Sequence, residues 1–216
     1  GESGSGKSVT MKAAVGLLDS NATINSGEIL YTYDDGHGQD KTVDLLKLSK
    51  KQLRTEYNGQ RLAMVFQDPM ASLNPRKKVG DIISEGMDIH HRFANRQERE
   101  EKISEMLKKV GLSPEHAARY PHQFSGGQRQ RVGIARALIM NPKLIIADEC
   151  ISALDVSIQA QVVNLMKDIQ AETQCAYLFI AHDLSMVKYI SDRIGVLHLG
   201  YMVAVSYTHL TLPTKL

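Results

Sequence analysis

The first eight residues of the chain have the types and spacing that phosphate binding requires. In GESGSGKS, Gly1 is followed by four residues and then by Gly6, Lys7 and Ser8, which is the spacing of the P-loop pattern. Glycine tolerates the positive φ angles with which a loop bends around an anion, so we expect Gly1, Gly4 and Gly6 to shape such a loop. Lys7 would reach the β- and γ-phosphates and Ser8 would ligate Mg²⁺.

The loop runs into a predicted helix. In VTMKAAVGLL, the residues Val9, Ala13 and Leu17 recur at helical spacing, which indicates one apolar side. The positive end of this helix would face the phosphates. The alternative is a flexible terminus rich in glycine and serine.

Two acids follow an apolar run of strand length. LIIADE places Asp148 and Glu149 directly after residues 144–147. In a P-loop protein such an aspartate holds Mg²⁺ opposite the loop hydroxyl, and the next glutamate orients or deprotonates the attacking water. The alternative is that the two acids only cap the next element.

A second stretch suited to anions is FSGGQRQR, residues 124–131. Ser125 is a good N-cap, and Gly126 and Gly127 let backbone approach a ligand closely. The helix that follows has an apolar side made of Val132, Ala135, Leu138 and Ile139. An ordinary capped helix is the alternative interpretation. One nucleotide need not use two anion-binding helix starts within one molecule.

The elements around these motifs alternate between strands and helices. Strands are predicted at 26–33, 61–67, 144–147 and 176–181, and a helix at 156–172. This order favours a parallel α/β sheet with ligands at the carboxyl ends of its strands. Residues 68–124 are more polar and helical, with Ile103, Met106, Leu107 and Val110 on one helix face. The charged run 95–102 is expected to be a solvated helix face.

Composition excludes several classes of protein. The chain has 216 residues, 43% of them hydrophobic and 23% charged, and a formal net charge of +2. Such a small charge argues against nucleic acid as the main partner, and the apolar runs are too short to span a membrane. Cys150 and Cys175 lack the spacing of a zinc or disulfide framework, so a reducing cytoplasm is the expected compartment.

Taken in order, GESGSGKS, VFQDP, FSGGQ, IIADE, SALD and IAHD resemble the nucleotide-binding subunit of an ABC transporter over nearly the whole chain. The resemblance implies a head-to-tail dimer with ATP and Mg²⁺ between the P-loop of one subunit and the FSGGQ stretch of the other. Catalysis would then involve Glu149, His182 and Gln67, and the metal would be held by Ser8, Gln67 and Asp148. The implied nucleotide contacts are Gly1, Gly4, Ser5, Gly6, Lys7, Ser8, Ser125, Gly126, Gly127, Gln128 and Asp155.

Within these roles, Gln67 would couple Mg²⁺ and the water to the transmembrane partner, Asp155 would contact the opposite subunit, and His182 would contact the γ-phosphate. The other seven histidines, including His90 and His91, are expected at the surface. The implied fold is a P-loop NTPase core, residues 1–67 and 130–205, with a mostly parallel sheet and an inserted helical subdomain, residues 68–129. Residues 206–216 are expected to be a non-native tail.

Longer stretches such as QDPMASLNPRKKVGDII and RYPHQFSGGQRQR are similar to the ATP-binding subunits of oligopeptide and dipeptide importers, the second subunit type in particular. The implied partners are a non-identical ATPase subunit, transmembrane permease subunits and, indirectly, an external solute-binding protein, at the cytoplasmic face of the membrane. Nickel or another solute is left open as the cargo.

The family normally has a strand before the P-loop and an upstream aromatic residue that stacks on adenine. This sequence shows neither, so we expect an N-terminally truncated fragment with an unpaired sheet edge. Cys150 stands where proline is common, and Phe124 stands where leucine is frequent. Two other functions stay open: an ABC-type ATPase that acts on DNA or ribosomes, and a non-catalytic nucleotide sensor.

Overall fold

The computed structural model describes residues 4–34 and 38–208. Its strands form three separate sheets. One is parallel and has three strands, and the other two are antiparallel hairpins. The strands are β1 Leu30–Asp34, β2 Asp40–Asp44, β3 Leu62–Val65, β4 Leu144–Asp148, β5 Ala176–Ile180, β6 Arg193–His198 and β7 Tyr201–Tyr207.

Helices connect the strands and make up most of the region between β3 and β4. The α-helices are α1 Lys7–Ala14, α2 Lys50–Gln52, α3 Pro69–Ser72, α4 Val79–Ile83, α5 Glu85–His90, α6 Arg96–Lys109, α7 Gly126–Leu138, α8 Val156–Thr173 and α9 Leu184–Ile190. Short 3₁₀ turns span Leu45–Lys47, Pro114–Ala118 and Pro121–Gln123, and a π-helical turn spans Leu53–Tyr57.

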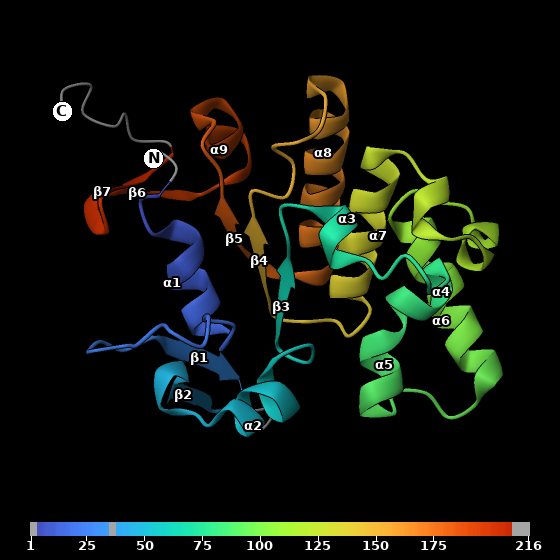
Figure 1. Cartoon of the computed structure of the whole chain (residues 1–216), viewed down its shortest axis with the longest axis horizontal. Coiled ribbons are helices and arrows are strands. Elements are labelled where there is room, and N and C mark those ends of the chain that lie inside the picture. The colour runs from blue at the N-terminus through green and yellow to red at the C-terminus, as the bar shows by residue number, and fades with distance from the viewer. Residues whose placement is uncertain (1–3, 35–37, 209–216) are drawn as a thin grey trace.

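The parallel sheet has the order β3-β4-β5, with β4 in the centre. Residues 145–148 of β4 are all buried, which shows that both faces of this strand are covered. Figure 1 shows the three strands between α1 on one side and α7 and α8 on the other. Because the strands are parallel, their carboxyl ends meet at one edge of the sheet, as the sequence predicts.

The two hairpins lie apart from the parallel sheet. β1 pairs with β2, and β6 pairs with β7. The predicted strand at 26–33 therefore exists, but it begins at Leu30. Among the described residues, β5 has a neighbouring strand on one side only, and Leu178 on it is 41% exposed.

The first helix is shorter than its apolar spacing predicts. α1 ends at Ala14, and Gly16 adopts a left-handed φ of 69°, which turns the chain away. Leu17 therefore lies beyond the helix. Val9 is 59% and Leu17 48% exposed, whereas Ala14 and Val15 are buried. The predicted apolar side of Val9, Ala13 and Leu17 is wrong. The glycine turn places Leu17 outside the helix, and Val9 is exposed although it lies within the helix.

The region between β3 and α7 is helical, as expected. α6 buries Ile103 and Leu107, and Val110 is buried just after its end. The charged run 95–102 has no buried residue, as expected of a solvated face. Arg99 is the exception in its contacts, because it donates hydrogen bonds to Asp88 and Asp81 and to the buried Ser84. An ion-pair network inside the subdomain accounts for this position, which charge patterning alone does not reveal.

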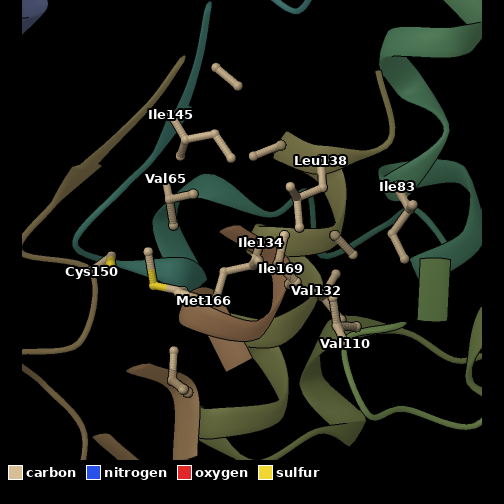
Figure 2. Packing of buried hydrophobic residues seen from close by; sticks show 14 of the residues in the cluster. Val65, Ile83, Val110, Val132, Ile134, Leu138, Ile145, Cys150, Met166 and Ile169 are labelled. Carbon is tan, nitrogen blue, oxygen red and sulfur yellow. The ribbon is translucent and has the colours of Figure 1, made fainter. Parts of the chain in front are cut away.

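One large core unites this helical region with the parallel sheet. It contains Ile83 and Val110 from the helical region, Val132 and Leu138 from α7, and Ile145 from β4. Figure 2 shows these side chains gathered around α7, with Met166 and Ile169 of α8 among them. α7 is therefore the element on which the helical region and the sheet both pack.

The last strand runs past the start of the expected tail. β7 continues to Tyr207, so the expected tail boundary at 206 falls inside a strand, and residues 209–216 lie outside the described residues.

Two histidines make contacts within the fold. His90 is half-buried, with its Nδ1 3.1 Å from Gln60 Nε2, and His116 packs its ring against Phe124. These two histidines are therefore not the plain surface residues that were predicted.

Candidate functional site

The P-loop has the backbone geometry that its glycines predict. Gly4 and Gly6 have φ of 87° and 89°, values that favour glycine, and Gly6 is the N-cap of α1. Ser5 is buried and accepts a hydrogen bond of 3.0 Å from Lys7 Nζ. Its carbonyl accepts one from the amide of Gly200, in the β6–β7 turn. Gly1 lies outside the described residues.

Ser8 and Asp148 meet although 140 residues separate them. Ser8 Oγ donates a hydrogen bond of 2.7 Å to Asp148 Oδ1, which joins the start of α1 to the end of β4. Asp148 is only 7% exposed. A hydroxyl and a carboxylate at this separation are the hard oxygen ligands that Mg²⁺ prefers, and Mg²⁺ usually completes its shell with waters and substrate phosphates. The residues present therefore fit the predicted metal.

Glu149 is the next residue and has an unusual backbone. Its φ is 45°, in the left-handed region that non-glycine residues seldom adopt. Its amide donates to the carbonyl of Ile180 on β5, and its own carbonyl accepts from Ser152 Oγ. These hydrogen bonds hold the turn and direct the side chain beyond the sheet edge.

Three strand ends converge on the Glu149 carboxylate. Gln67, two residues after β3, donates from Nε2 to Glu149 Oε2 at 3.2 Å. His182, two residues after β5, lies with Nδ1 4.0 Å from Glu149 Oε1. The structure thus brings together the three residues predicted to be catalytic, beside the Ser8–Asp148 pair. A carboxylate flanked by an amide and an imidazole can orient a water and receive its proton.

The second predicted anion site lies elsewhere in the molecule. Ser125 caps α7 in a capping box, in which its Oγ accepts from the amide of Gln128 and Gln128 Oε1 accepts from the amide of Ser125. Figure 1 shows α7 across the strands from α1. Asp155 is the exposed N-cap residue of α8 and makes no side-chain capping bond. The structure therefore does not unite Ser125, Gly126, Gly127, Gln128 and Asp155 with the P-loop of the same chain.

Sequence reasoning missed several residues that shape the site. Gly200 contacts the P-loop through its amide, and Ser152 fixes the carbonyl of Glu149. Cys150 directly follows Glu149 in the chain, and burial raises the pKa of its thiol to about 12. No spacing signal identifies these residues, because they are brought to the site by packing between distant elements.

A P-loop, an acidic strand end that meets the loop hydroxyl and a second helix start suited to anions together define a nucleotide-binding protein of the P-loop class. The chain belongs to the ABC transporter family, whose family model matches residues 1–152. This confirms the family and the α/β P-loop fold expected from the motifs. Within the described residues, no helix combines the length and the apolar character needed to cross a membrane.

Two similar proteins carry transport names. The chain is 55% identical over 203 residues to the oligopeptide transport ATP-binding protein OppF of Bacillus subtilis (strain 168). The aligned residues cover 94% of this chain and 62% of that protein. It is 54% identical to the dipeptide transport ATP-binding protein DppF of Lactococcus lactis subsp. cremoris (strain MG1363), over 95% of this chain and 62% of that protein. The expected likeness to the oligopeptide and dipeptide branch is thereby confirmed. The chain spans about 62% of the length of these relatives.

A solved structure has the same architecture. The dimeric post-hydrolysis state of the ATP-binding cassette MJ0796, bound to ADP and Pi, superposes with a TM-score of 0.77 at 27% identity. The match covers 96% of this chain and 82% of that one.

Proposed function

We propose that this chain is the ATP-hydrolysing part of a subunit that drives peptide import through an ABC transporter. The observation that carries the proposal is the convergence of Ser8, Asp148, Gln67, Glu149 and His182 at one sheet edge, next to a P-loop. The names of the OppF and DppF relatives support peptides as the cargo. Those names also favour transport over work on DNA or ribosomes.

Binding of ATP would begin at the start of α1. The amides of the loop around Gly4 and Gly6 and the ammonium of Lys7 would hold the phosphates, aided by the positive end of the helix. Ser8 and Asp148 would hold Mg²⁺, with Gln67 beside them. When bound, Mg²⁺ would neutralise charge on the phosphates as the phosphoryl group transfers.

The Glu149 carboxylate would orient the attacking water and accept its proton. The bond from Gln67 restrains one carboxylate oxygen, and the other faces His182. The His182 imidazole would hydrogen-bond to the γ-phosphate, so that charge developing there meets a fixed donor. In this mechanism the protein supplies positioning and electrostatic stabilisation without a covalent intermediate.

A second subunit would complete the site. Because Ser125, Gly126, Gly127 and Gln128 lie across the sheet from the P-loop of their own chain, they would serve a nucleotide bound to the partner in a head-to-tail dimer, and Asp155 would contact that partner. The partner would be a second, non-identical ATPase subunit. Permease subunits would follow the closing and reopening of this dimer, and an external binding protein would supply the solute. The complex would place this chain at the cytoplasmic face of the membrane.

The experiment is a Mg²⁺-ATP binding titration and a phosphate-release assay on the chain and on Lys7→Ala. We expect Lys7→Ala to weaken ATP binding by about tenfold or more, since it removes a charge-assisted contact. Lys12→Ala, later on the same helix, is the matched control and should bind as the wild type does. Equal affinity of wild type and Lys7→Ala would contradict the proposal.

A further inference from the structure

The turn between β6 and β7 lies at the site, and the proposed mechanism does not use it. His198 pairs with Tyr201, so the turn between the strands consists of Leu199 and Gly200. Both residues have positive φ, 46° and 84°, which is the arrangement of a type I′ turn. Asparagine, aspartate or glycine usually occupies the first of these two positions, whereas leucine seldom adopts a left-handed backbone.

Packing of the Leu199 side chain does not explain this backbone. Leu199 is 73% exposed, so its side chain gains little from burial in the turn. Sparsely populated backbone conformations persist where the surrounding structure enforces them, and they cluster at functional sites. The contacts of the turn's backbone are therefore the better explanation of its conformation.

The backbone of the turn contacts two successive residues of the P-loop. The amide of Gly200 donates a hydrogen bond of 3.2 Å to the carbonyl of Ser5. A Cβ at Gly6 would lie 3.9 Å from Gly200 Cα and 4.0 Å from Leu197 Cδ2. Figure 1 shows the β6–β7 hairpin beside the start of α1. The hairpin therefore packs directly against the loop that would hold the phosphates.

The hydrogen bond to the Ser5 carbonyl fixes the direction of the Gly6 amide. The two groups belong to one peptide unit, and this unit is trans, as are all those that the structure describes. In a trans peptide unit the C=O and N–H groups point in opposite directions. Because the Ser5 carbonyl points toward Gly200, the Gly6 amide points away from the hairpin.

Ser5 also connects this hydrogen bond to the Lys7 side chain. Ser5 is buried, and its Oγ accepts a hydrogen bond of 3.0 Å from Lys7 Nζ. A shift of Ser5 would therefore move both the Gly6 amide and the ammonium group that is expected to reach the β- and γ-phosphates. The Gly200 amide thus acts on one residue that bears on two proposed phosphate contacts.

Building on the function proposed above, we propose that Gly200 is a positioning residue for the P-loop. Its amide holds the Ser5 carbonyl toward the hairpin, which keeps the Gly6 amide and the Lys7 ammonium arranged for phosphate before the nucleotide arrives. A preorganised loop loses less conformational entropy when it binds. The left-handed turn is maintained because it presents this amide to the loop.

The binding test replaces the Gly200 amide by an ester, through incorporation of glycolic acid in place of glycine. The ester removes the N–H donor and adds no side chain. We expect Mg²⁺-ATP to bind about three- to tenfold more weakly, the effect of losing one hydrogen bond. A titration of the full chain with Mg²⁺-ATP measures this change.

The matched control is the same ester at Gly59, just before β3. Gly59 also has a positive φ, 80°, and its amide donates to the carbonyl of Leu62 at 2.7 Å. This ester should lower the unfolding temperature but leave Mg²⁺-ATP affinity as in the wild type. Wild-type affinity in the Gly200 ester, or an equal loss of affinity in both esters, would overturn the proposal.

A second readout needs no nucleotide. In the isotope-labelled, nucleotide-free chain, the NMR signal of the Gly6 amide reports on the surroundings of that amide. The Gly200 ester should shift this signal, and the Gly59 ester should leave it in place. An unshifted Gly6 signal would overturn the proposal whether or not the chain binds ATP. A shifted signal together with a wild type that binds no ATP would contradict only the proposed function.

Discussion

Single residues at this site owe their properties to neighbours that are distant in sequence. Ser8 and Asp148 are 2.7 Å apart because α1 begins where β4 ends. Glu149 occupies a left-handed backbone conformation. Two hydrogen bonds stabilise it: the Glu149 amide donates to the Ile180 carbonyl, and Ser152 Oγ donates to the Glu149 carbonyl. The hydrogen bond from Gln67 then orients the Glu149 carboxylate. Backbone and side chain are thus both fixed before any substrate arrives.

The residue-scale prediction concerns Glu149→Gln. The amide keeps the size of the carboxylate but cannot accept a proton from water, so hydrolysis should fall by at least about a hundredfold. ATP binding should be retained, because the proposed phosphate contacts come from the P-loop and not from Glu149. Phosphate release and nucleotide binding are measured on the same preparations. Glu172→Gln on α8, an exposed partner of Lys109, is the control, and wild-type turnover in Glu149→Gln would refute the assignment.

At the scale of elements, α7 has to pack closely on the segment after β4. Gly127 leaves room for Ile158, whose Cγ2 would be 2.5 Å from an added Cβ. Gly133, two turns further along the same helix, has nothing within 4 Å of the same position. The two glycines therefore serve different purposes, although both lie within one helix.

We predict opposite effects of alanine at these two positions. Gly127→Ala should lower the free energy of unfolding by about 1–3 kcal/mol, because Ile158 must move. Gly133→Ala should raise it by about 0.5–1 kcal/mol, because alanine loses less backbone entropy in a helix. Urea unfolding of the nucleotide-free chain measures both. Equal shifts for the two variants would show that the close contact with Ile158 has no energetic weight.

At the scale of the whole molecule, stability depends on how the helical region between β3 and α7 holds together. Arg99 of α6 joins α4 and α5 through Asp81 and Asp88, with bonds of 3.1 and 2.7 Å. Its hydrogen bond is the largest cause of the lowered pKa of Asp88. Because Asp88 has a lower pKa in the folded state, its contribution to stability is present above the unfolded pKa and lost as the pH falls.

The prediction at this scale is a pH-dependent loss of stability in Asp88→Asn. At pH 7 the variant should unfold with about 1 kcal/mol less free energy than the wild type, a modest value because the pair is partly exposed. The difference should shrink as the pH drops below about 4, where the wild-type carboxylate becomes protonated. Asp81→Asn is the matched control, with a smaller effect expected since Asp81 is more exposed. A difference that stays constant with pH would contradict this origin.

Much of the fold and site follows from the sequence. The strands at 62–65, 144–148 and 176–180 and the helix at 156–173 lie where apolar runs and helical spacing predict them. The P-loop motif locates Gly4 and Gly6, which have positive φ, and the polar residues after each strand mark the edge of the candidate site. These signals are local, because hydrophobic periodicity and glycine conformation are properties of short segments.

Only the tertiary structure decided which of these residues meet. Strand order and packing bring Ser8 into contact with Asp148. They also bring Gln67, Glu149 and His182 together, and they place α7 across the sheet from α1. Leu17 and Arg99 show the same limit. A glycine turn places Leu17 beyond its predicted helix, and an ion-pair network holds the half-buried Arg99 against Asp81 and Asp88. Local patterns determine the segments, whereas contacts between distant segments depend on the free energy of packing the whole chain, which no short pattern contains.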